Sequence, residues 1–108
     1  DLADYLASLE RVRALAPRRI YPAHGPVIDE PERVLAGYLV HRHEREQQIV
    51  AALRAGADTP ETIVARVYDG LAPAQVPLAA ESVTAHLRKL ERERRARHAA
   101  GAWHIMDP

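Results

Sequence analysis

The chain has 108 residues, enough for one compact domain and an appendage but too few for two full domains. Its 15 basic and 15 acidic residues balance, so net charge indicates neither nucleic acid nor a membrane as a partner. The lack of cysteine excludes a disulfide framework and thiolate metal sites. Because no stretch resembles a signal peptide or a membrane span, we expect a cytoplasmic protein that does not bind membranes.

Residues 1–28 predict a helix, a short strand and a loop. Apolar residues recur at spacings of three and four up to Pro17, which ends the helix. This stripe consists of Leu2, Tyr5, Leu6, Leu9, Val12, Leu15 and Ala16. Ile20 and Tyr21 favour a strand, and Gly25-Pro26 favours a turn. We interpret these residues as the last helix–strand–loop unit of a larger α/β layer, so that the stripe self-associates or is mobile without its sheet.

A second helix is predicted from Glu30-Pro31-Glu32 to about Gly56. Its centre, residues 41–48, is entirely polar, which is typical of a helix that bridges two bodies through solvent. We therefore expect a remnant domain at 1–30, a bridging helix at 31–56 and a second domain at 45–108. The residues predicted to form a polar cluster at the junction, with substrate contact as the alternative, are His41, Arg42, Arg45 and Glu46.

The second domain shows the element order of a winged helix. Asp58-Thr59-Pro60-Glu61 predicts the start of a short helix, and a further helix is expected from about Pro77. The predicted inner face of that last helix contains Leu78, Val83, Leu87 and Leu90. A hairpin then follows around Gly101, with Trp103 packing in its second strand.

The densest basic segment overlaps the last helix and the first strand. Its candidate phosphate-binding residues are Arg88, Lys89, Arg92, Arg95 and Arg97. Alternating charges on an exposed helix usually form a solvated face, so we favour a packing role, with nucleic-acid binding as the alternative. His86, on the same helix, is expected to make a structural contact.

His24 is the main candidate for chemistry. It follows the predicted strand within Pro22-Ala23-His24-Gly25, and a neutral imidazole held by a rigid turn is a good zinc ligand. The alternative is an ordinary exposed loop histidine. Because catalytic zinc needs about three protein ligands, we expect this chain alone to be metal-free and inactive.

The motif around His24 resembles the last metal-binding motif of metallo-β-lactamase-fold hydrolases. Further residues match, in order and approximate spacing, the β-lactamase-like branch that has a C-terminal winged-helix domain. These residues are Tyr38, His41-Arg42, Arg45-Glu46, Ile49, Leu53, Val67-Tyr68, Ser82-Val83 and His86-Leu87-Arg88-Lys89-Leu90. One departure is Arg94, at a place where related sequences often have a glycine that ends the last helix.

The resemblance implies a mostly α fold with a small β hairpin, in which the winged helix follows the last helix–strand–loop unit of a metallo-β-lactamase layer. It also implies a missing N-terminal lactamase domain, since the upstream His-x-His-x-Asp-His motif is absent from these residues. His24 would then complete one half of a two-zinc centre, and the winged helix would pack on or shape the active-site face. Family substrates include thioesters, β-lactams and single-stranded RNA. The alternative is a separate winged-helix module that binds nucleic acid or protein.

Overall fold

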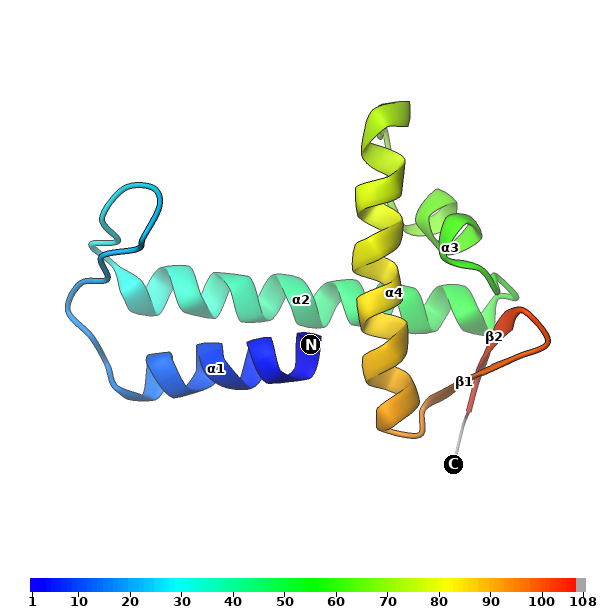
Figure 1. Ribbon diagram of the computed structural model, residues 1–108, viewed down its shortest axis with the longest axis horizontal. Coiled ribbons are helices and arrows are strands. Elements are labelled where there is room, and N and C mark those ends of the chain that lie inside the picture. Colours follow the sequence, from blue (N-terminus) through cyan, green and yellow to red (C-terminus); the bar gives the residue numbers. More distant parts are fainter. Residues whose placement is uncertain (107–108) are drawn as a thin grey trace. The chain divides into compact units, whose positions relative to one another are not determined.

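The computed structural model describes residues 1–106, which form two compact units divided between Glu44 and Arg45. The division falls inside a long helix, α2, which contributes to both units. The helices are α1 (Leu2–Ala14), α2 (Pro31–Arg54), α3 (Pro60–Val67) and α4 (Val76–Arg92), with a 3₁₀ turn at Pro73–Gln75. Two strands, β1 (Ala96–Ala99) and β2 (Ala102–Ile105), follow α4 (Figure 1).

The first unit contains α1, a loop and the beginning of α2. The carboxylate of Asp1 caps α1 by accepting the amide hydrogen of Asp4 at 3.1 Å. Near the other end of α1, Arg13 pairs with Glu32 at 2.8 Å. None of the residues of α1 is buried, and Leu15 is 80% exposed. The apolar stripe predicted for this helix is therefore only partly covered within the described residues: Leu2, Leu6 and Leu9 are half-buried, and the rest of the stripe is exposed.

The strand expected at Ile20 and Tyr21 is reduced to a single β-bridge between Ile20 and Ile28. Two backbone hydrogen bonds, of 3.0 and 2.8 Å, join these residues in both directions. A longer strand needs a neighbouring strand to satisfy its remaining amides and carbonyls, and the described residues of this unit provide only the other side of the loop.

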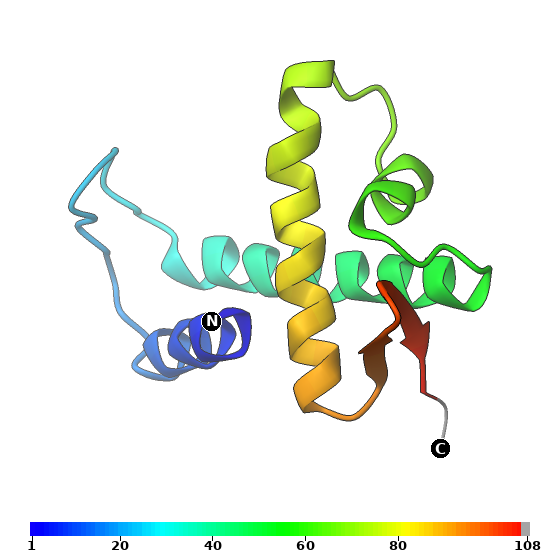
Figure 2. The ribbon, with the colours of Figure 1, turned by 45° about the vertical axis from the view of Figure 1, so that its right-hand side comes forward.

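The second unit is a winged helix, as the sequence predicted. Helix α3 lies beside α4, and the antiparallel β1–β2 hairpin follows the C-terminal end of α4 (Figures 1 and 2). The amide of Trp103 in β2 donates to the carbonyl of Asp58 at 2.8 Å, which holds the hairpin against the connection between α2 and α3. The principal buried core residues are Ile49, Leu53, Ile63, Val64, Val83, Leu87, Leu90 and Trp103.

The prediction of which residues form the inner face of α4 was wrong at one position. Leu78 is 71% exposed, and Ala79 takes the buried place beside the start of the helix. Leu78 and Leu87 are nine residues apart, which places them about 180° apart around an α-helix. Because Leu87 is fully buried, Leu78 must face away from the core.

Two helices of this unit end in the same hydrogen-bonded motif. After α2, Gly56 has φ +97° and donates to the carbonyl of Leu53, while Ala57 donates to Ala52. After α4, Arg94 has φ +59° and donates to Glu91, while Arg95 donates to Leu90. Both are Schellman motifs, which favour glycine at the left-handed position. Arg94 thus occupies the conformation that suits the glycine common in related sequences.

Candidate functional site

His24 is exposed within the loop that the Ile20–Ile28 bridge closes. The adjoining Gly25 adopts φ +94°, a left-handed conformation that glycine reaches without steric cost. Just outside the bridge, Arg19 pairs with Asp29 at 3.1 Å and adds a second link across the base of the loop. The loop therefore presents the imidazole of His24 to the exterior on a short, closed turn.

His24 has no companion metal ligands in the described part of the chain. No group of three or more histidine, aspartate or glutamate side chains within residues 1–106 is placed to hold a metal ion. A neutral imidazole is chemically suited to zinc, but a catalytic zinc ion needs about three protein ligands. The imidazole of His24 therefore has the chemistry of a single zinc ligand, and the described residues alone offer too few ligands for a catalytic zinc ion.

The polar residues predicted at the domain junction have separate surroundings. His41 is exposed, and Arg42 is half-buried. Arg45 belongs to the second unit, where its guanidinium lies 3.9 Å from the centre of the Tyr68 ring and donates to Gln48 at 3.1 Å. This stacking places the positive charge over the electron-rich face of the ring.

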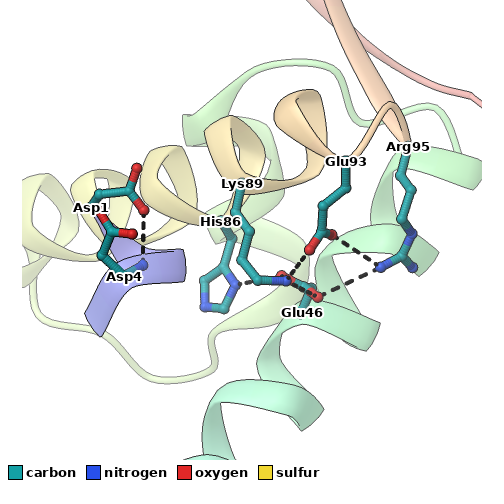
Figure 3. Close-up of polar contacts among 7 residues, drawn as sticks. All are labelled: Asp1, Asp4, Glu46, His86, Lys89, Glu93 and Arg95. Atoms are coloured by element: carbon teal, nitrogen blue, oxygen red, sulfur yellow. Dashed lines mark hydrogen bonds and ion pairs between the residues drawn. The ribbon is translucent and has the colours of Figure 1, made fainter. Parts of the chain in front are cut away.

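Glu46 is buried in the second unit and forms the centre of a polar cluster, the Glu46 cluster, shown in Figure 3. Lys89 donates to both carboxylate oxygens at 3.0 Å, and the Nδ1 atom of His86 lies 3.3 Å from Oε1. Arg95 approaches Oε2 at 3.6 Å. Glu93 completes the cluster by pairing with Lys89 at 3.0 Å and with Arg95 at 3.6 Å. These contacts join α2 to α4 and to the residue that leads into β1.

The charged partners control the ionisation of Glu46. Burial alone would raise the pKa of this carboxyl group, but the hydrogen bonds from His86 and Lys89 and the charge of Lys89 outweigh it. The pKa of Glu46 is therefore held below its ordinary value. Burial would likewise lower the pKa of Lys89, yet its bonds to Glu93 and Glu46 raise it above the usual value. Both groups are consequently charged near neutral pH.

His86 is 1% exposed, and its Nε2 atom has no hydrogen-bond partner among the described residues. The expected structural role of His86 is thus confirmed by its burial and its contact with Glu46. That specific contact was not predicted, because the two residues are 40 positions apart. A signal existed: Glu46 lies on the same helical stripe as Ile49 and Leu53, and a carboxylate on an inner face requires a buried partner.

The basic segment does not form a uniform exposed surface. Lys89, which is half-buried, and Arg95, which is exposed, direct their charges toward Glu46 and Glu93. Arg88, Arg92 and Arg97 are exposed. Trp103 is 4% exposed and stacks on His98, with ring centres 4.6 Å apart and an angle of 12° between the rings. The expected packing role of Trp103 is therefore confirmed. No helix within residues 1–106 is long and apolar enough to span a membrane.

The fold of the second unit defines a winged-helix domain, and comparison with known proteins places it in a family. Residues 59–103 match the family model of the beta-lactamase associated winged helix domain. The chain is 39% identical over 100 residues to a beta-lactamase-like protein 2 homolog of Drosophila melanogaster, covering 90% of this chain and 34% of that protein. The corresponding Caenorhabditis elegans homolog is 37% identical over 91 residues, and the match covers 83% of this chain and 31% of that protein.

A solved metallo-beta-lactamase family protein from Thermus thermophilus has a similar fold. It aligns with a TM-score of 0.77 at 20% identity, covering 97% of this chain and 33% of that structure. The chain spans about a third of the length of the curated relatives described above. It belongs to the β-lactamase-like metallo-β-lactamase-fold proteins and corresponds to the C-terminal part of such a protein.

Proposed function

We propose that the chain is the C-terminal part of a metal-dependent hydrolase and that His24 supplies one ligand to its metal centre, most naturally zinc. The observation that carries this proposal is the exposed His24 on a loop closed by the Ile20–Ile28 bridge. The remaining ligands would come from a preceding lactamase domain, in line with the greater length of the relatives. A bound zinc centre lowers the pKa of water and stabilises negative charge on oxygen during hydrolysis.

Within this proposal, the residues of the chain have distinct duties. The hydrogen bonds at the base of the loop restrain the backbone that carries His24, which reduces the conformational freedom lost when a ligand bond forms. The winged helix packs on or shapes the active-site face. The family substrates include thioesters, lactams and phosphodiesters, and the described residues of the second unit contain no set of side chains that selects one of them.

A separate nucleic-acid-binding role is the weaker candidate. Two of its five proposed residues, Lys89 and Arg95, form ion pairs with Glu46 and Glu93. Phosphate binding by either residue would compete with these internal pairs. The packing role of the basic segment therefore remains our preferred interpretation.

The test uses the full-length parent protein carrying His24→Ala, with His43→Ala as a matched control because His43 is also exposed. We expect His24→Ala to lower bound zinc and to reduce kcat by at least about 100-fold, without changing the circular dichroism spectrum. The His43→Ala protein should retain its metal content and activity. Wild-type zinc content and turnover in the His24→Ala protein would remove His24 from the metal centre.

A further inference from the structure

The face of α4 that points away from the core carries a regular pattern of small and charged residues. We call this surface, formed by Glu81, Thr84, Ala85 and Arg88, the α4 outer face. Glu81 and Ala85 each have a neighbour of the set three residues on, and both Glu81–Ala85 and Thr84–Arg88 are four residues apart, so all four side chains lie on one side of the helix. Together with the start of α3, they line an open groove of about 570 Å³, whose other lining residues are Pro60, Glu61, Pro77 and Ala80.

The centre of this surface is small and apolar. Ala85 presents only a methyl group, and the hydroxyl of Thr84 donates to the carbonyl of Ala80 at 2.9 Å. Because that hydrogen bond satisfies the hydroxyl within α4, the threonine offers its methyl group to a partner. Small side chains let two helices approach to the short end of the usual 8–10 Å axial separation.

Opposite charges lie at the two ends of the same surface. Glu81 and Arg88 are separated by seven residues, which is two helical turns and about 10 Å along the axis. Both side chains are exposed, and neither has an ion-pair partner in the described part of the chain. The surface is therefore negative at one end, apolar in the middle and positive at the other end.

This arrangement is self-complementary under a twofold axis that passes between Thr84 and Ala85. An antiparallel copy of α4 places Arg88 of the second copy opposite Glu81, and the symmetry repeats this pair at the other end. The antiparallel orientation also sets the two helix dipoles in opposite directions. A parallel copy in the same register would instead place like charges together.

We propose that the α4 outer face is a homodimer surface, at which a second copy of this chain docks its own α4 in antiparallel orientation. One pair of helices buries less than the roughly 800 Å² per partner of a standard interface. The dimer is therefore weak, with a Kd on the order of 100 µM, and its strength depends on the two Glu81–Arg88 pairs. Added salt weakens it by screening these exposed charges.

The test measures the Kd of the 108-residue chain by sedimentation equilibrium up to about millimolar concentration. Glu81→Arg and Arg88→Glu, each alone, place like charges at both ends and should weaken dimerisation at least about tenfold. An equimolar mixture of these two single variants should recover the wild-type Kd, because each variant then complements the other. The double variant with both substitutions should also recover it.

Arg66→Glu is the matched control, since Arg66 is exposed on α3 and does not line the groove. It should leave the Kd unchanged. The proposal fails if the wild-type chain is monomeric throughout the concentration range. It also fails if the chain associates but the single reversals have no effect, because the contact then uses another surface such as α1. Failure of the mixture to recover the dimer would exclude the antiparallel register.

Discussion

At the scale of single residues, Glu46 connects three parts of the winged helix. Its carboxylate contacts His86 and Lys89 of α4 and lies near Arg95, which leads into β1. Removing one member of a buried ion pair leaves the remaining charges without compensation, and this usually costs about 3–5 kcal/mol. Lys89 would still retain its pair with Glu93, which reduces that cost.

We therefore predict that Glu46→Gln lowers the free energy of unfolding by about 2–3 kcal/mol at pH 7. The folded-state pKa of Glu46 is lowered, so its contribution is fully present above the unfolded pKa. That contribution is lost as pH falls through the folded pKa. The wild-type and variant stabilities should converge in acid, which urea unfolding between pH 7 and pH 3 measures. Glu44→Gln, at an exposed position of the same helix, should change stability by less than about 0.5 kcal/mol.

Arg94 provides a second residue-scale prediction. A side chain at φ +59° costs about 1 kcal/mol that glycine avoids, whereas the matching motif after α2 already has Gly56. Arg94→Gly should therefore raise the free energy of unfolding by about 0.5–1 kcal/mol. Arg94→Ala keeps the Cβ atom and should give no such gain. If alanine stabilised the protein as much as glycine, loss of charge would be the cause instead of relief of backbone strain.

At the scale of elements, α1 and α4 differ in how much of their apolar surface is covered. Five residues of α4 are buried, whereas α1 buries none of its own within the described chain. Burial of apolar side chains supplies most of the stability of a short helix in a protein. The two helices should therefore open with very different free energies.

We predict that the amides of α1 exchange with deuterium at least about 100-fold faster than those of α4 in a dilute monomeric sample. Hydrogen exchange followed by mass spectrometry measures the two helices in one experiment. Protection of α1 that increases with protein concentration would mean that its stripe self-associates. Equal protection of α1 and α4 in the dilute monomer would contradict the interpretation of residues 1–28 as a unit without its sheet.

At the scale of the whole molecule, residues 1–106 contain no group of three or more side chains placed to hold a metal ion, and the relatives are about three times as long as this chain. We predict that the purified 108-residue chain hydrolyses no thioester, lactam or phosphodiester bond, even with added zinc, because activation of water needs the missing ligands. Zinc-dependent turnover that is unchanged by His24→Ala would contradict this prediction. A matched assay of the full-length parent shows whether the substrates tested are suitable.

The sequence by itself determined the order of elements and the family. Local signals such as Thr59 before Pro60, Gly56 after α2 and the turn at Gly101 act on neighbouring residues, so they fix helix ends and the hairpin without long-range information. The motif around His24 is also local, which is why it identifies a candidate ligand without supplying the rest of a site.

Only the tertiary structure decided which inner-face residues pair. The sequence placed Glu46 in a polar cluster with other residues of its own helix, and only the structure shows that its carboxylate contacts His86 and Lys89 on another helix. The tertiary structure also decided that Leu78 is exposed. Contacts with α3 and the hairpin determine which side of α4 faces the core, and the hydrophobicity of one residue does not. A buried charge takes the partner that compensates its lost hydration, and which partner that is depends on how the helices cross.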